Sequence, residues 1–428
     1  YHHRNAAPST YAFDFVWDRS APAVGPFCTD VDGNVLMDFV GHVGAMPLGY
    51  HTPKLMDPLS ALDLVDPMKI AGQDFYVTGG PDLPPDVPGP TDLMARLTDL
   101  SSHYDMDRVF LSNTGAEAVE NALKVSFDHT QGKYVLTFQG AFHGRTLGTL
   151  SLNRSKGVYR RHFPEIASVH DVPFCDDRTC DRDSCRCGFF PGSESPSSLR
   201  RMLGATDGYV DPTEIACVVV EPIQGEGGYR VPSDAFMSEL ASVCSEYDLT
   251  LVVDEVQSGI GRTGELWASD HYPIEPDVIA SAKALRVGAT IGREEVFPEE
   301  RYRLSSTWGA GDILGAAMGA LTLDAIEEYD LLSNATARGR QMTELLGDAD
   351  LPGAVDVRGK GLMLAVEWES ADRRDAVVEA GLKRGFLTLG CGTRSIRMLP
   401  PLDVTPREIR LAADLLTDAA NDAAGPAA

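Results

Sequence analysis

Short apolar runs alternate with longer segments of helical spacing through the middle of the chain. Four of the runs are apolar almost throughout, as strands are when both faces of their sheet are covered. They are RVFLS at 108–112, KYVLTF at 133–138, ACVVVE at 216–221 and LTLVVDE at 249–255. Between them, apolar residues recur at helical intervals in residues 113–129 and 234–248. The alternation predicts an α/β fold with a mostly parallel sheet covered by helices.

The pattern changes towards both ends of the chain. DVDGNVLMDF at 30–39 has an Asp-Gly turn signal between two apolar runs and predicts a hairpin. From about residue 330, helical segments alternate with short apolar runs, which we expect to pack with the hairpin as a smaller domain. The expected division is a segment 1–50 that joins the small domain, a large domain 51–325 and a small domain 326–428.

Two stretches interrupt the regular pattern. Residues 79–92, GGPDLPPDVPGPTD, predict a loop rich in proline and glycine. Residues from about 174 to 198 are polar and rich in cysteine, proline and serine, which indicates an irregular insertion in the large domain.

Composition and charge narrow the choice of partners. Of the 428 residues, 43% are hydrophobic and 23% are charged, which is typical of a soluble globular protein. The net charge of −26 and the pI of about 4.7 argue against nucleic acid or an anionic membrane as a partner, since both require a basic face. No apolar run is long enough to span a bilayer, and the first residues have no secretory pattern, so we expect a cytoplasmic protein.

The basic residues of this acidic chain are mostly arginine, and lysine is rare. The chain has 40 Asp and 23 Glu, but only 8 Lys against 29 Arg. An acidic, lysine-poor chain indicates adaptation to a salt-rich cytoplasm, where ions screen the repulsion between its charges; a merely acidic protein is the alternative. Adaptation predicts a melting temperature that rises from dilute buffer to high salt. Equal stability in dilute buffer would contradict it.

Lys283 stands in PDVIASAKALRVGATIG, residues 276–292, which are apolar or small almost throughout. In dry surroundings a lysine loses part of its preference for the charged form. It then becomes a better nucleophile towards an aldehyde, with which it forms a Schiff base. The alternative is a lysine that reaches from a helix end into water.

Asp254 ends the buried run at 249–255, at the edge where open α/β sheets bind ligands. A carboxylate there can pair with a protonated ring nitrogen, such as that of pyridoxal phosphate. Gln257 follows three residues later and could hydrogen-bond the phenolic oxygen of that ring. The alternative role for Asp254 is that of a helix N-cap.

Three further motifs follow predicted strands. The turn Thr114-Gly115-Ala116 precedes a helix, and backbone N–H groups at such a turn bind phosphate. In GAFHGRT, Phe142 could stack on a flat cofactor, with His143 as its polar neighbour, and Arg145 could bind a carboxylate. The alternatives are core packing for Phe142 and a surface ion pair for Arg145. EPIQGEGG at 221–228 has two glutamates, which are either solvated or partners for an arginine such as Arg397.

In chain order the five motifs are the turn at 114–116, GAFHGRT, EPIQGEGG, DEVQSGIGRTG and Lys283, and together they resemble the class III pyridoxal-phosphate aminotransferases. The resemblance runs from DVDGNVLMDF at 30–39 through RGKGLMLAVE at 358–367 to IRMLPPL. It implies fold type I, with a large domain on a mostly parallel, seven-stranded sheet and a small α+β domain. It also implies that Lys283 holds the cofactor covalently and acts as the base, and that Asp254 pairs with the pyridine nitrogen.

The resemblance assigns the other residues as well. Gln257 contacts the phenolic oxygen, Phe142 stacks on the ring beside His143, and the turn at 114–116 holds the phosphate. Thr307, in SSTWG, completes the phosphate site from a neighbouring subunit, which implies a homodimer or a dimer of dimers. The substrate side chains are Arg397 for an α-carboxylate, Glu226 to mask that arginine, and Arg145 for a distal carboxylate.

The implied reaction is a ping-pong transfer from an amino donor to a keto acid, with 2-oxoglutarate expected first. ALRVGATIG and RLSSTWGAGD resemble lysine 6-aminotransferases more than ornithine or 4-aminobutyrate enzymes. We therefore expect an ω-amino donor, lysine first. An amino-acid racemase or another isomerase of the same family is the alternative, because it needs the same lysine and cofactor. A homologue without catalysis would have lost Lys283 or Asp254.

Four cysteines crowd into CDDRTCDRDSCRC. Four thiolates suit zinc, but the spacing C-x4-C-x4-C-x-C is unlike that of a common zinc finger. A metal site, a disulfide clip and unlinked loop thiols are the three interpretations. The residues are Cys175, Cys180, Cys185 and Cys187.

Overall fold

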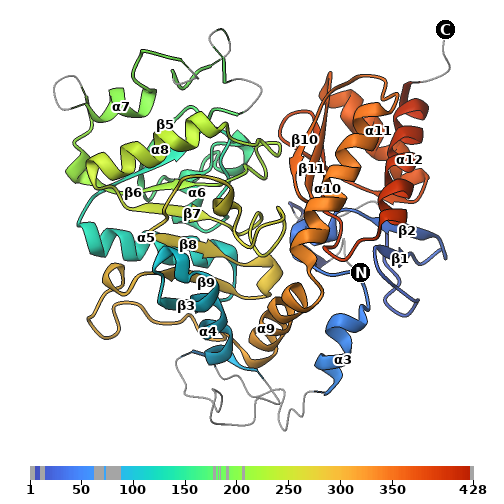
Figure 1. Cartoon of the computed structure of the whole chain (residues 1–428), viewed down its shortest axis with the longest axis horizontal. Helices are drawn as coiled ribbons and strands as arrows, with labels where there is room; N and C mark the ends of the chain where they lie inside the picture. The colour runs from blue at the N-terminus through green and yellow to red at the C-terminus, as the bar shows by residue number, and fades with distance from the viewer. Residues whose placement is uncertain are drawn as a thin grey trace.

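The chain forms two bodies that lie side by side and are linked by helix α9 (Ile313–Glu328) (Figure 1). One body is built on a seven-stranded sheet and the other on a four-stranded sheet, with a three-stranded sheet beside it. This computed structural model describes residues 5–9, 15–61, 72–73, 88–176, 180–181, 183, 185–188, 192–204 and 208–424.

The large sheet has the strand order β3-β9-β8-β7-β6-β4-β5. Its strands are β3 (Arg108–Ser112), β4 (Tyr134–Phe138), β5 (Ser168–Val172), β6 (Ile215–Val220), β7 (Leu251–Asp254), β8 (Val278–Ser281) and β9 (Gly288–Gly292). Neighbours from β8 to β5 pair in parallel, and β9 runs antiparallel to both β3 and β8. The predicted α/β fold with a mostly parallel sheet is confirmed.

The apolar runs are continuous because both faces of the sheet are covered. In β6, Val218 and Val220 belong to an apolar cluster that includes helix α8 (Asp234–Tyr247). The alternate residues Cys217 and Val219 pack in another cluster, with helix α5 (Gly115–Thr130). Alternate residues of a strand point to opposite faces, so every position of β6 is buried.

The second body contains segments from both ends of the chain. Its four-stranded antiparallel sheet comprises β10 (Ala354–Lys360), β11 (Met363–Trp368), β14 (Ser395–Met398) and β13 (Leu389–Cys391). Its helices are α10 (Leu331–Asp348), α11 (Ala371–Lys383) and α12 (Pro406–Ala424). The hairpin of β1 (Phe27–Thr29) and β2 (Val35–Asp38) pairs in parallel with β12 (Phe386–Leu387).

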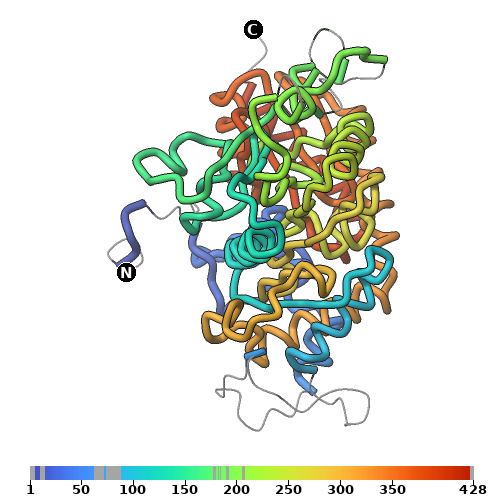
Figure 2. Tube along the Cα trace, turned by 90° about the vertical axis from the view of Figure 1, so that its left-hand side faces the viewer, coloured from blue at the N-terminus to red at the C-terminus, as the bar shows by residue number. Residues whose placement is uncertain are grey.

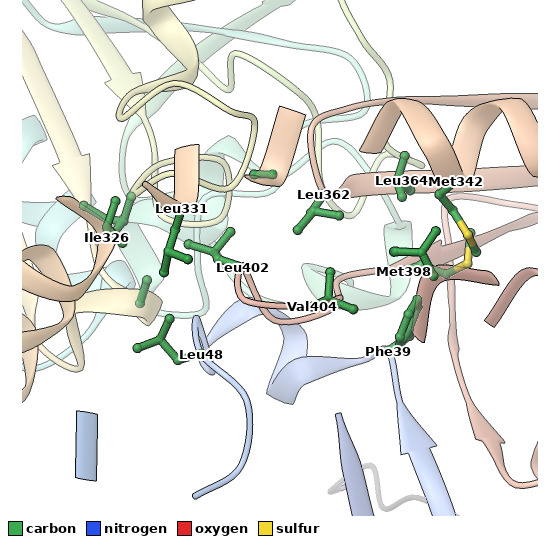
Figure 3. Close-up of a cluster of buried hydrophobic side chains, with 14 of the residues drawn as sticks. Phe39, Leu48, Ile326, Leu331, Met342, Leu362, Leu364, Met398, Leu402 and Val404 are labelled. Carbon is green, nitrogen blue, oxygen red and sulfur yellow. The ribbon is translucent and has the colours of Figure 1, made fainter. Parts of the chain in front are cut away.

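A continuous apolar core joins these segments (Figure 3). It brings Phe39 and Leu48 from the N-terminal part next to Leu402 and Val404 from the C-terminal part. Both groups are at most 2% exposed. Burial of this kind stabilises the fold by roughly 1.5–3 kcal/mol for each large side chain. The N-terminal and C-terminal parts of the chain are therefore held together by side-chain packing as well as by strand pairing.

The two interrupting stretches have different outcomes. Residues 79–87 of the predicted loop lie outside the described residues, and its last three residues are helical. Helix α4 (Pro90–Leu100) begins there, because Pro90 suits a first helical position and Asp92 accepts a hydrogen bond from the N–H of Gly89 at 2.8 Å. Much of the stretch from 174 to 198 is described and is irregular up to helix α7 (Ser198–Leu203).

Over the described ranges, every helix is too short or too polar to cross a membrane.

Candidate active site

The carboxyl ends of β6, β7 and β8 border a cavity of about 1010 Å³ that β14 of the second body also lines. The structure brings eleven of the residues assigned from the sequence to its walls: Thr114, Gly115, Ala116, Phe142, His143, Arg145, Glu226, Asp254, Gln257, Lys283 and Arg397. They come from segments nearly 300 residues apart. The cavity is therefore built by the fold and not by one local motif.

Lys283 follows β8 and opens a short 3-10 turn, Lys283–Leu285. Its backbone has a φ of +37°, which a non-glycine residue rarely adopts and which fixes where the side chain leaves the chain. Burial lowers the pKa of its amine to about 8, and the positive charge of Arg397 adds to the effect. A neutral, nucleophilic amine is therefore accessible near physiological pH.

Asp254, at the end of β7, forms a buried pair with His143. The Asp254 Oδ2 lies 2.8 Å from His143 Nδ1, and Asp254 Oδ1 accepts the N–H of Val256 at 3.0 Å. The backbone N–H of His143 donates to Asn153 Oδ1 at 2.7 Å, which fixes the position of this loop. Burial alone would lower the pKa of His143, but the hydrogen bond and charge of Asp254 raise it. The pair fixes the carboxylate of Asp254 at the cavity wall.

Glu226 and Arg397 form an ion pair inside the cavity. Glu226 Oε1 lies 2.6 Å from Arg397 Nη1, and Glu226 Oε2 accepts the hydroxyl of Tyr159 at 3.1 Å. Burial would raise the pKa of Glu226, but Arg397 and then Lys156 lower it below its usual value. The glutamate is charged, and it neutralises an arginine that is only 4% exposed.

Two polar groups at the cavity are buried without hydrogen-bond partners in the described part of the chain. Nε and Nη1 of Arg397 make no hydrogen bond, because the contact with Glu226 is close but poorly directed. The Oε1 of Gln257 has no partner, although Nε2 donates to the carbonyl of Val43 at 3.3 Å. Buried polar atoms of this kind are costly unless a ligand satisfies them.

The turn at residues 114–116 begins helix α5. The hydroxyl of Thr114 caps the helix by accepting the N–H of Glu117 at 3.1 Å. Gly115 lies so close to the segment after β7 that a Cβ would meet Val256 Cγ1 at 2.6 Å, so only glycine fits. The first N–H groups of a helix have no partner within it and favour an anion. Because these residues line the cavity, the turn can hold a phosphate there.

Thr307 is the assigned residue that does not line the cavity of its own chain. It is exposed, and its hydroxyl donates to Glu117 Oε1 at 2.8 Å on the first turn of α5. Asn113 Nδ2 donates to the Thr307 hydroxyl at 3.3 Å. Thr307 thus lies beside the phosphate turn but outside the cavity.

Phe142 and Arg145 lie on the same wall as Tyr159. The rings of Phe142 and Tyr159 meet edge to face with centroids 5.4 Å apart. The guanidinium of Arg145 lies 4.8 Å from the centre of the Tyr159 ring and 5.5 Å from that of Phe142. Arg145 is exposed, so it can meet the outer end of a substrate. Sequence reasoning missed Tyr159, because SKGVYR carries no periodic signal or motif.

Glu221 joins two of the motifs. Its Oε1 accepts the N–H of Phe142 and its Oε2 the N–H of Gly225, each at 2.8 Å. Burial raises the pKa of Glu221 to about 7. From the sequence, Glu221 is expected to be either solvated or paired with an arginine, and neither alternative predicts these two backbone contacts. Its position at the end of a buried strand, like that of Asp254, was the signal.

Pyridoxal phosphate fits this arrangement on the evidence of the side chains. Lys283 could act as a nucleophile for its aldehyde, Asp254 as a counter-charge for its ring nitrogen, and the turn at 114–116 as a cradle for its phosphate. Gln257 has an unsatisfied amide oxygen at the same cavity. The cofactor would thus find a complementary group for each of its polar ends.

The comparisons with known proteins agree with this geometry. A family model described as aminotransferase class-III matches residues 19–420. The chain is 32% identical to an acetylornithine aminotransferase from Synechocystis (91% of this chain, 86% of that protein) and 31% identical to a 4-aminobutyrate aminotransferase from Mycobacterium leprae (92% and 89%). An alanine/serine racemase from Pyrococcus horikoshii is 31% identical (93% and 84%).

A solved structure is similar over almost the whole chain. The lysine aminotransferase from M. tuberculosis superposes with a TM-score of 0.82 at 29% identity, covering 98% of each chain. The match of the family model and the similarity of the fold lead to the same conclusion. The chain belongs to the class-III aminotransferases, which are pyridoxal-phosphate-dependent enzymes of fold type I.

Proposed function

We propose that the chain transfers the terminal amino group of an ω-amino donor to a keto acid. Lysine is the first candidate donor, 4-aminobutyrate and ornithine are the next, and 2-oxoglutarate is the first candidate acceptor. The observation that carries the proposal is the Glu226–Arg397 ion pair in the cavity. The names of the relatives from M. leprae and M. tuberculosis support this donor class.

Bound pyridoxal phosphate would supply an aldehyde that takes up the amino group and a ring that withdraws electrons from the donor carbon. Lys283 would bind that aldehyde through Nζ. The donor amine would displace Nζ from the aldehyde, and the freed lysine amine, with a pKa of about 8, would move a proton between the donor carbon and the cofactor carbon. The turn at 114–116 would fix the position of the phosphate.

Asp254 and His143 would keep the ring in its electron-withdrawing form. The carboxylate of Asp254, held in position by His143 Nδ1, would stabilise a proton on the ring nitrogen. Phe142 would pack on the ring, and Glu221 would hold the Phe142 loop through its backbone N–H. Positioning of this kind contributes to rate by preserving the reactive geometry.

Glu226 would select between the two substrates. With Arg397 neutralised, the cavity accepts a donor that has no carboxylate beside its reacting amine, and Arg145 would bind its outer carboxylate. When a keto acid enters, its carboxylate would replace Glu226 on Arg397, whose Nε and Nη1 have no hydrogen-bond partner. One site could then serve two unlike substrates.

The test is glutamate formation from 2-oxoglutarate with lysine, ornithine, 4-aminobutyrate or alanine as the sole donor, in high salt. The proposal expects glutamate with at least one ω-amino donor at a rate well above that with alanine. Glutamate formed from alanine but from none of the ω-amino donors would overturn the donor class while leaving the family assignment intact.

The second candidate function is amino-acid racemisation. The similarity to the P. horikoshii racemase is the observation that favours it, because the same lysine and cofactor serve both reactions. Racemisation needs no keto acid and causes no net loss of amine. A single enantiomer that loses optical activity while its total concentration stays constant would identify it.

Glu226→Gln is expected to shift substrate preference. Glutamine keeps the shape but leaves the charge of Arg397 uncompensated, so a donor without a nearby carboxylate would face an unpaired buried cation. The KM for ω-amino donors should rise by about 10-fold or more, since losing one partner of a buried charge pair costs roughly 2–5 kcal/mol. The KM for the keto acid should stay the same or fall.

The matched control is Glu379→Gln, which makes the same change on the exposed face of α11, where Glu379 pairs with Lys383. It should leave both KM values unchanged. Equal KM changes for both substrates in Glu226→Gln would contradict the switching role.

We further propose that the active unit is a homodimer or a dimer of dimers, in which Thr307 reaches the phosphate turn of the neighbouring subunit. The aromatic side chains of Tyr302 and Trp308, on the same segment, support an interface there because they are 90% and 61% exposed. A solution mass of one chain for the active enzyme would overturn the proposal.

A further inference from the structure

Three of the four cysteines of the segment between β5 and α7 converge outside the walls of the active-site cavity. The segment lies at the upper edge of the molecule in both views (Figures 1 and 2). Cys175 Sγ is 3.6 Å from Cys185 Sγ, which is 3.2 Å from Cys187 Sγ. These three sulfurs all lie within 4.8 Å of one another, and Cys180 is partly buried against the same apolar cluster as Cys175 and Cys187.

These separations suit ligands around one metal ion. A disulfide bond is about 2.05 Å long, so the observed sulfurs are too far apart to be bonded. Two sulfurs bound to a tetrahedral zinc ion at about 2.3 Å are about 3.8 Å apart, close to the observed values. Three of the four cysteines in these 13 residues reach this arrangement, although the spacing of the four is unlike that of a common zinc finger.

The backbone holds the first and last cysteine in place. The carbonyl of Cys175 accepts the N–H of Ser233 at 3.2 Å. The carbonyl of Cys187 accepts the N–H of Ser198 at 2.7 Å and its hydroxyl at 3.0 Å. Cys175 and Cys187 are 1% and 3% exposed, in an apolar cluster beside the large sheet. The sulfurs are therefore positioned by the fold and not by a flexible loop alone.

The same segment is tied to the loop that carries Glu226. Asp176, next to Cys175, forms an ion pair with Arg230 at 2.7 Å. Arg230 in turn donates to the side chain of Gln224 at 3.2 Å, within EPIQGEGG. A bound metal would therefore stabilise a segment that supports the cavity, without taking part in catalysis.

We propose that Cys175, Cys180, Cys185 and Cys187 bind one zinc ion as a closed structural site. Four protein ligands leave no open position for water or substrate, which is typical of structural and not catalytic zinc. Binding converts four thiols to thiolates and releases four protons to solvent, with no oxidation or reduction.

The first test is the metal content of the full chain, produced with zinc in the medium and purified under reducing conditions without chelator or affinity tag. We expect about one zinc per chain, as in other tetrathiolate sites. Cys185→Ser and Cys187→Ser should lose most of it. The control Cys217→Ser changes a buried cysteine in another apolar cluster and should retain it. Wild-type protein without stoichiometric metal would overturn the proposal.

A second test does not depend on the variants folding. Cobalt(II) added to chelator-treated wild-type protein should give the visible bands of a tetrahedral cobalt tetrathiolate, and zinc should abolish them. Absence of these bands in fully reduced protein would contradict the site. Peptide mapping of protein isolated without reductant is a further check. Disulfide bonds between these cysteines would show that a covalent clip, and not a metal, holds the segment together.

Discussion

Lys283→Ala is expected to lower the rate of amine transfer by at least about 10³-fold, because it removes both the covalent anchor of the cofactor and the proton-transferring base. The amine that would be lost is buried and has its pKa lowered to about 8. Lys283→Arg should fail equally, since a guanidinium keeps the charge but is not a nucleophile. The rate of glutamate formation from 2-oxoglutarate measures the loss.

The control for this prediction is Lys383→Ala, which removes an exposed lysine from α11. It should retain full activity. A folded Lys283→Ala protein should also regain part of its rate when methylamine is added, because a small amine can enter the vacated space and move the proton. Activity of Lys283→Ala within about 10-fold of the wild type would mean that another group is the base.

Asp254→Asn is expected to lower kcat by about 10²–10³-fold. The change leaves the ring nitrogen without its counter-charge, and a fall of this size corresponds to roughly 3–4 kcal/mol of lost transition-state stabilisation. The KM for the amino donor should change little, because Asp254 pairs with His143 and not with the donor-binding residues. Steady-state kinetics in saturating pyridoxal phosphate separate kcat from KM and from weaker cofactor binding.

Asp277→Asn makes the same substitution next to the same sheet, where Asp277 pairs with Arg293 away from the cavity. It should leave kcat unchanged even if the protein melts at a lower temperature. Asp254→Asn with unchanged kcat and a raised donor KM would show that Asp254 binds the donor and does not act on the cofactor.

The sheet could be predicted because its strands are buried on both faces. β6 and β7 are buried at every position, so their sequences are apolar runs that stand out from helical spacing. The strand ends were equally visible, which is why Asp254 and the turn at 114–116 could be proposed as site residues. Each of these signals is local, so it can be recognised in the sequence without knowledge of the tertiary contacts.

The groups that the sequence did not reveal act through contacts between distant segments. Tyr159 meets Phe142 and Glu226, but no motif or spacing marks it. Glu221 stands at the end of a buried strand, but the way it joins two loops through backbone N–H groups depends on tertiary contacts. The helix at Pro90 was assigned to a loop, because proline and glycine are abundant just before a helix as well as in loops. The pairing of Glu226 with Arg397 was proposed only as one of two alternatives until the family resemblance was considered.

The most direct test of the central claim is a half-reaction in high salt with the cofactor-loaded enzyme and a single amino donor, without any keto acid. We expect the visible absorption of bound pyridoxal phosphate to be replaced by that of pyridoxamine phosphate with an ω-amino donor, with one donor consumed per active site. Addition of 2-oxoglutarate should restore the first spectrum. A spectrum that stays unchanged while an amino acid loses its optical activity would contradict amine transfer and identify an isomerase.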